Sequence, residues 1–243
     1  MILLLAGMIS ACTTHPTNQQ TTPAQPDINT LVTSSLLQAQ QNKMSRAKIT
    51  IQRALSLDAN HVDANNIAGF IYGKSNQAEL AVKYFEKALS IAPNDASTLN
   101  NYGSFLCDYG NLQEAEKKFL RAGTHAANPN PEIAYTNAGL CALRVPDLDQ
   151  AADYFKTALD FKQQNAVALY QLARINLVKQ RAIPALERLH AYSQFAAHTP
   201  QTLKLGIEIG RLMKDKEVEV GYFNLLQNEY PTSDEYQWAV ATM

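Results

Sequence analysis

The feature that most constrains this chain is a period of 34 residues. Identical residues recur at that interval in the pairs Gly69 and Gly103, Ala81 and Ala115, and Phe85 and Phe119. A fixed period of roughly 20 to 50 residues is typical of repeat architectures, in which each unit buries its apolar face only against its neighbours. The chain is therefore expected to form a stack of similar units rather than one closed core.

The segment 62–95 indicates the type of repeat. It resembles the tetratricopeptide pattern W-x2-L-G-x2-Y…A-x3-F…P, with the following residues in register: Gly69, Tyr72, Ala81, Phe85 and Pro93. The pattern continues through 96–131, which contains two extra residues, and through 132–165. Less regular copies fall at 28–61, 166–199 and 200–233, the last aligned on Phe223 and Pro231.

These repeats predict an all-α fold, a right-handed α-solenoid of six helix pairs over residues 28–233, with residues 234–243 as a C-terminal tail. A glycine inside a helix costs about 1 kcal/mol relative to alanine, so the repeated glycines need compensation. We expect each one to allow a close approach of the second helix of its repeat at an opposing alanine, while a phenylalanine fills the space between repeats. The three sets are Gly69, Ala81 and Phe85; Gly103, Ala115 and Phe119; and Gly139, Ala151 and Phe155.

Charge and motifs exclude several classes of function. The 21 Lys and Arg residues against 22 Asp and Glu give a net charge of −1, which provides no electrostatic basis for binding nucleic acid. The five histidines follow no metal-ligand spacing, and no glycine-rich nucleotide loop occurs. The sequence therefore predicts no enzyme, metal site or cofactor. An enzyme would need a catalytic cluster that no motif indicates.

Residues 1–12 form an apolar run that is too short to span a bilayer and ends in Cys12. The end of this run, Ile9-Ser-Ala-Cys12, resembles a bacterial lipobox. That resemblance implies a lipoprotein signal peptide over 1–11, a lipid on Cys12 and, with Thr13 following, an outer-membrane location facing the periplasm. No Lys or Arg precedes the run, so we expect a truncated start. The alternative is a buried N-terminal segment with an incidental cysteine.

Residues 12–27 are rich in Thr, Gln and Pro and have no large apolar side chain, which predicts a flexible tether. Beyond it, tetratricopeptide geometry places the first helix of each repeat along a concave groove. The expected groove residues are Asp63, Asn66, Phe70, Asn100, Ser104, Asp108, Thr136, Leu140, Arg144, Val167, Tyr170 and Arg174. Each of them alone is compatible with a solvated face, but the set favours binding of an extended peptide or a partner edge.

The lipobox, the tether, the six repeats and the segments 100–110 (NNYGSFLCDYG) and 137–141 (NAGLC) together resemble one family. It is the family of type IV pilus biogenesis and stability lipoproteins, the tetratricopeptide-repeat pilotins of the pilus secretin. The resemblance implies an outer-membrane lipoprotein that binds the secretin and promotes its localisation and multimerisation. The alternative of the same fold is another cell-envelope adaptor, which serves peptidoglycan enzymes or outer-membrane assembly.

Cys107 and Cys141 are the two cysteines that remain if Cys12 carries lipid. They occupy the twelfth and tenth positions of neighbouring repeats, late in first helices that are expected to stack. A periplasmic protein lies where disulfides form and persist, so we expect these residues to be bonded. The alternative is a pair of small buried residues that merely pack.

Overall fold

The computed structural model describes residues 26–145 and 147–242, and all regular structure in these ranges is helical. The helices are α1 (Ile28–Gln40), α2 (Met44–Leu57), α3 (Val62–Lys74), α4 (Ala78–Ile91), α5 (Ala96–Asp108), α6 (Leu112–Thr124), α7 (Pro131–Ala142), α8 (Leu148–Phe161), α9 (Ala166–Val178), α10 (Ala182–Ser193), α11 (Pro200–Met213), α12 (Lys216–Glu229) and α13 (Asp234–Thr242). Helices α1 to α12 pack as six consecutive pairs, one in each predicted repeat segment. The predicted fold class, an all-α solenoid, is confirmed.

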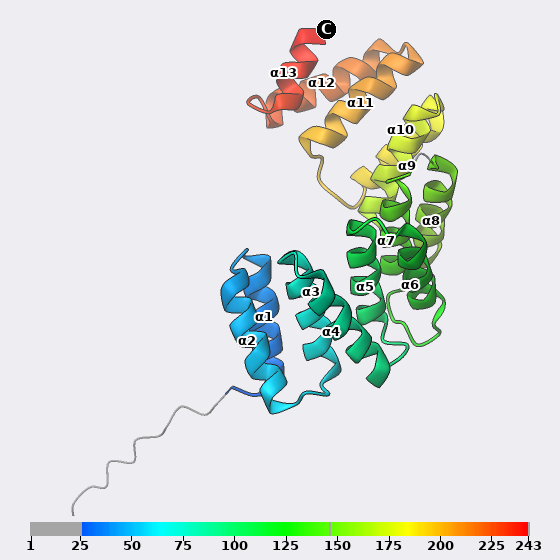
Figure 1. Ribbon diagram of the computed structural model, residues 1–243. Helices are drawn as coiled ribbons and strands as arrows, with labels where there is room; N and C mark the ends of the chain where they lie inside the picture. Colours follow the sequence, from blue (N-terminus) through cyan, green and yellow to red (C-terminus); the bar gives the residue numbers. More distant parts are fainter. Residues whose placement is uncertain (1–25, 146, 243) are drawn as a thin grey trace, which may run out of the picture.

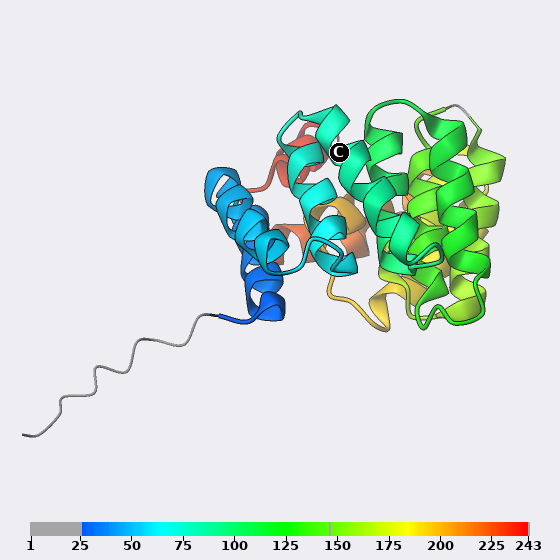
Figure 2. The ribbon, with the colours of Figure 1, turned by 60° about the horizontal axis from the view of Figure 1, so that its bottom comes forward.

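The pairs stack in chain order along a curved path (Figure 1). In Figure 1 the second helices α6 and α8 lie on the outer, right-hand side of α5 and α7, and both ends of the stack curve to the left. Figure 2 shows the same arrangement after rotation, with α1–α4 and α11–α13 again on one side of the α5–α10 block. The first helices of the middle repeats therefore line the inner side of the curve.

Cap residues recur with the repeat and fix where the first helices begin. Asp27, His61 and Asp95 precede α1, α3 and α5, and each side chain accepts a hydrogen bond from a backbone N–H of the first turn. Asn165 and Thr199 do the same for α9 and α11. These bonds satisfy donors that have no partner inside the helix.

The repeated glycines face aromatic rings rather than alanines. A Cβ atom added at Gly69, Gly103 or Gly139 would lie 2.7 Å from the phenylalanine ring of the same repeat, which is closer than real Cβ contacts come. The expectation that an alanine lies opposite each glycine is therefore wrong, because the space beside the glycine is occupied by the ring of Phe85, Phe119 or Phe155. Phe85 also reaches the next repeat, as expected, and stacks on Tyr102 with ring centroids 5.0 Å apart.

The sixth pair packs one residue out of the predicted register. Tyr222, rather than Phe223, is buried, and a Cβ at Gly206 would lie 2.3 to 2.5 Å from the Tyr222 ring. Phe223 is half-buried and lies beside Tyr236, with ring centroids 5.9 Å apart. The alignment on Phe223 is therefore wrong by one position in the last repeat.

Residues 234–242, expected as a tail, form helix α13, which packs on α11 and α12. Its Trp238 ring lies under two cations of α11, with Lys204 Nζ at 4.3 Å and the Arg211 guanidinium carbon at 5.0 Å from the ring centroid. Ala239 is completely buried. The helix therefore covers the end of the solenoid, as a capping element does.

The predicted signal peptide (1–11), the lipidation site Cys12 and nearly all of the tether (12–27) lie outside the described residues. Within the described ranges, no helix has the length and apolar character needed to cross a bilayer.

Candidate docking surface

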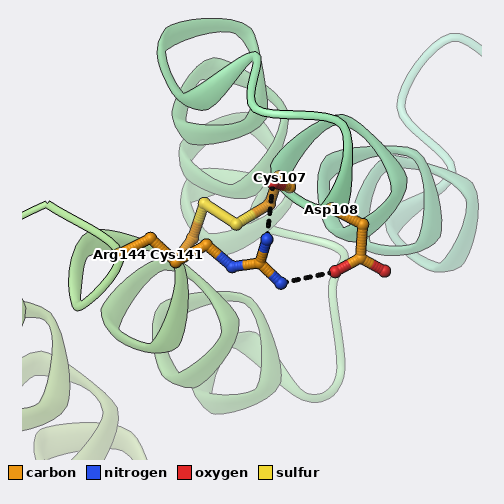
Figure 3. Close-up of a disulfide and its surroundings, with 4 residues drawn as sticks. All are labelled: Cys107, Asp108, Cys141 and Arg144. Carbon is orange, nitrogen blue, oxygen red and sulfur yellow. Dashed lines mark hydrogen bonds and ion pairs between the residues drawn. A yellow bond between two sulfur atoms is a disulfide. The ribbon is translucent and has the colours of Figure 1, made fainter.

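Three charged residues at the ends of neighbouring first helices form an ion ladder. Lys74, at the end of α3, and Arg144, just after α7, both pair with Asp108 at the end of α5, at N···O distances of 3.1 and 2.7 Å. Arg144 also donates to the backbone carbonyl of Cys107 at 3.1 Å (Figure 3). The carboxylate of Asp108 is thus already neutralised by two cations within the fold.

Asp108 and Arg144 were both expected to contact a partner. They pair with each other across the third and fourth repeats and stay about half exposed, so the expected contact remains a prediction. Lys74 was missed, although it stands 34 residues before Asp108, and that repeat spacing could have identified it. Because the three side chains are about half exposed, each pair contributes no more than about 1 kcal/mol to stability.

Next to the ladder, Cys107 and Cys141 are joined by a disulfide, with Cα atoms 5.9 Å apart (Figure 3). Both residues are buried, and the bond connects α5 to α7. The covalent link and the ladder therefore hold the same two first helices together at their C-terminal ends.

Two other expected contact residues are buried and serve the fold. Asn66 Oδ1 accepts a hydrogen bond from Asn101 Nδ2 at 2.9 Å, which connects α3 to α5. Thr136 accepts from Asn165 Nδ2 and donates to the carbonyl of Glu132, both at 2.7 Å. Asn66 and Thr136 were expected to reach a partner; because both are buried and hydrogen-bonded inside the protein, they are left out of the docking surface defined below.

Four of the remaining expected residues line clefts on the first-helix side. Phe70 and Ser104 border a cleft of about 170 Å³ between α3 and α5, beside the ladder. Asn100 and Ile133 border a second cleft of about 260 Å³. Ile133 also borders a third, of about 440 Å³, together with Val167. The second and third clefts share Asn130 and Ile133 and lie side by side at the starts of α5, α7 and α9; we call the two together the hollow.

Exposed apolar side chains gather in the fourth and fifth repeats. Leu140 and Val167, which were predicted, are 39% and 44% exposed. Ile133 and Val178, which were not, are 48% and 65% exposed. They occupy the second and thirteenth positions of their repeats, as Asp63 and Asp108 do, so a position-by-position comparison of the repeats could have found them.

Polar residues also line the clefts on this side, among them Asp95, Glu132 and Lys162. The Oδ1 atom of Asn100 is buried and lacks a hydrogen-bond partner within the described residues. The Arg174 guanidinium carbon lies 5.8 Å from the centroid of the half-buried Tyr170 ring. Burial raises the pKa of Tyr170, which keeps its hydroxyl protonated at neutral pH. Asp63 is exposed at the edge of the surface.

We define the docking surface as the expected residues that stay accessible on the first helices, together with Ile133 and Val178. They are Asp63, Phe70, Asn100, Ser104, Ile133, Leu140, Val167, Tyr170, Arg174 and Val178. In the described part of the chain no group of His, Cys, Asp or Glu residues could hold a metal ion. A surface that combines exposed apolar side chains with polar and charged groups is suited to binding another polypeptide.

Comparison with known families supports the repeat assignment directly. The tetratricopeptide repeat model matches residues 62–95, and a second tetratricopeptide repeat model matches residues 84–117. The fold is that of a tetratricopeptide-repeat protein. The matched ranges cover the second repeat and much of the third, where the Gly and Phe register is most regular.

Full-length relatives of this tetratricopeptide-repeat chain include proteins of type IV pili. Type IV pilus assembly protein PilF of Pseudomonas aeruginosa is 26% identical over 198 residues, covering 82% of this chain and 79% of PilF. The solved structure of Pseudomonas aeruginosa PilF has a TM-score of 0.74 at 25% identity and covers 89% of this chain and 97% of that one. The chain is homologous to PilF along nearly its whole length.

A second solved structure, that of PilW, described as a widely conserved type IV pilus biogenesis factor, agrees equally well. Its TM-score is 0.75 at 27% identity, and the match covers 88% of this chain and 98% of PilW. The relationship therefore extends over the whole solenoid and not only over the repeats that match the family models.

Proposed function

We propose that this protein is an outer-membrane lipoprotein that binds the type IV pilus secretin and promotes its localisation and multimerisation. The observation that carries the proposal is the end-to-end similarity to PilF and PilW, two proteins named for pilus assembly and biogenesis. Tetratricopeptide repeats alone would be compatible with many functions. The match over almost the full length of both relatives narrows that choice.

The docking surface supports a polypeptide partner. The hollow at the starts of α5, α7 and α9 offers exposed apolar contacts at Ile133 and Val167, and Leu140 adds a third on the same docking surface. An extended segment of the secretin would bury these side chains. The disulfide and the ion ladder lie at the opposite, C-terminal ends of α5 and α7 and hold these two helices at a fixed separation.

The lipid on Cys12 supplies the second part of the proposal. Cys12 would hold the solenoid at the outer membrane, with the residues up to 27 as a spacer between lipid and α1. Delivery of a bound secretin subunit to that membrane then requires both the anchor and the docking surface.

The test is a comparison of three strains: gene deletion, Cys12→Ser and wild type. We expect deletion to reduce heat-resistant secretin multimers and surface pili strongly. Cys12→Ser should leave the fold intact, since Cys12 precedes α1, but move the protein out of the outer-membrane fraction and reduce multimers. Membrane fractionation and immunoblots of the secretin measure both effects. Unchanged multimers in the deletion strain would contradict the proposal and favour another envelope adaptor role.

A further inference from the structure

A cleft of about 480 Å³ opens on the side of the molecule where the α5–α6 and α7–α8 turns lie. Its wall comes from Gly110 and Asn111 in the first turn, from the start of α6, from the end of α7 and from α8. None of the docking-surface residues lines it. We call it the acidic cleft, after Glu116, the carboxylate in its wall.

Glu116 is held in place by two neutral donors. Its Oε1 atom accepts a hydrogen bond from Gln150 Nε2 at 3.0 Å and a second one from the Tyr154 hydroxyl. Burial and the adjacent carboxylate raise the pKa of Tyr154, so its hydroxyl remains a donor at neutral pH. Both partners come from α8, which fixes the carboxylate against the next repeat.

The charge of Glu116 is not matched by a cation. Among the described residues Glu116 forms no ion pair and its Oε2 atom has no hydrogen-bond partner. The lysines that follow on α6 are directed elsewhere, because Lys117 pairs with Glu114 at 2.6 Å and Lys118 lies 5.3 Å from the centroid of the Tyr102 ring. A half-buried carboxylate with one ordered oxygen and one free oxygen attracts a basic group.

The rest of the wall suits the stem of a long basic side chain. Leu112, Ala138 and Ala142 provide apolar contacts, while the Asn111 and Gln113 side chains are at the same cleft. Arginine and lysine pack their methylene stems on such surfaces and place the charge at a polar end. Guanidinium also presents several donors at once to a carboxylate, amides and carbonyls.

We propose that the acidic cleft is a second protein-binding site, which takes an arginine side chain of a partner protein, with the guanidinium on Glu116 Oε2. The site is independent of the docking surface, and it lies between the two repeats that the disulfide joins, since Cys141 is part of its wall. A partner bound there would contact the third and fourth repeats simultaneously.

The probes are two acetylated, amidated tripeptides, Ala-Arg-Ala and its uncharged citrulline counterpart. Each is titrated into the isotope-labelled full chain, and the amide signals of Gly110, Asn111 and Gln113 are followed by NMR. We expect saturable shifts of these signals with the arginine peptide and at least about tenfold weaker binding of the citrulline peptide, because only the former gives a charge-assisted bond.

Glu116→Gln is the matched variant, since the amide oxygen can still accept from Tyr154, and Glu114→Gln on the same helix is its control. Glu116→Gln should weaken binding at least about tenfold and Glu114→Gln by less than about twofold. Because Glu116→Gln alters a packed contact, the exposed Gln113→Lys variant provides a second test, and its added cation should weaken binding about fivefold or more. Equal binding of the two peptides, shifts confined to other regions, or unchanged binding in both Glu116→Gln and Gln113→Lys would overturn the proposal.

Discussion

The middle repeats and the C-terminal end of the solenoid solve the same packing problem with different residues. In the second, third and fourth repeats a glycine on the first helix receives the ring of a phenylalanine on the second, always at the same repeat positions. In the sixth repeat Gly206 receives Tyr222, one residue before the expected position. The middle pairs pack against a following repeat, whereas the sixth pair packs against the single helix α13.

The difference teaches which part of a repeat tolerates change. The first helices of the fifth and sixth repeats, α9 and α11, still begin 34 residues apart, because their cap residues Asn165 and Thr199 have that spacing. The contact between the glycine and the aromatic ring, in contrast, lies one position earlier in the sixth repeat than in the middle repeats. The residues at the packing positions thus vary less in the middle repeats, which pack between two neighbouring repeats, than in the sixth pair, which packs against α13.

The largest expected effect is loss of a middle ring. Phe119→Ala should lower the free energy of unfolding by about 3 to 5 kcal/mol, because the ring is almost completely buried and its removal leaves a cavity against Gly103. Urea unfolding followed by circular dichroism measures the change. A loss below about 1 kcal/mol would show that the ring is not part of the core.

The disulfide should stabilise the middle and not the end. It closes a loop of 34 residues, for which the chain-entropy model gives about 3.7 kcal/mol at most. In Cys107→Ser, Cys141→Ser we therefore expect lower stability and faster amide hydrogen exchange in α5 and α7, with α11 to α13 unchanged. Thiol titration of the unfolded, unreduced wild type, freed of its lipid-bearing end, checks the starting point, and two free thiols would refute the bond.

The shift of register at the end predicts a difference between adjacent residues. Tyr222→Ala should destabilise the protein by about 3 kcal/mol, and Phe223→Ala by about 1 to 2 kcal/mol, because the first ring is buried against Gly206 and the second is half-buried. Equal stability of the two variants, measured by urea unfolding, would contradict the one-residue shift that places Tyr222 rather than Phe223 in the core.

The smallest expected effect is a dependence of stability on pH that arises from His198, just before the sixth repeat. Burial lowers the pKa of His198, whose ring lies edge-on to Tyr222 and whose Nδ1 is 3.2 Å from Thr202 Oγ1. Glu229 opposes this shift and His190 adds to it. The unfolded chain then binds a proton more readily, so stability falls as the pH drops below the ordinary histidine pKa of about 6.5. Thermal unfolding between pH 7.5 and 5 should show a smaller decrease for His198→Gln than for wild type.

Much of the fold follows from sequence because it depends on local signals that repeat. Gly69, Phe85 and the caps at Asp95 and Asn165 each act within one or two neighbouring units, so a single period reveals them. Helix α13 was missed because residues 234–242 belong to no repeat, and the contact of Trp238 with Lys204 and Arg211 forms only when the last pair is in place.

The candidate site was harder to predict, because the position of a residue in its repeat indicates which side of the helix it lies on but not which side chain it pairs with. Asp108 and Arg144 stand at equivalent positions of neighbouring repeats and neutralise each other, which requires the stacking distance between α5 and α7. No sequence pattern predicts the position of the Glu116 carboxylate, because Gln150 and Tyr154, which hold it, come from the next repeat.

The central claim is that the docking surface binds the secretin, and a direct binding measurement tests it. The affinity of purified secretin for the full chain is compared between wild type, Leu140→Asp with Val167→Asp, and a control, Leu80→Asp with Ile183→Asp, which places the same charges on exposed apolar residues of the second helices α4 and α10. We expect at least about tenfold weaker binding in the first variant, because charged groups would be desolvated at the contact, and less than about threefold in the control. Equal affinity of wild type and the Leu140 and Val167 variant, both normally folded, would contradict the claim.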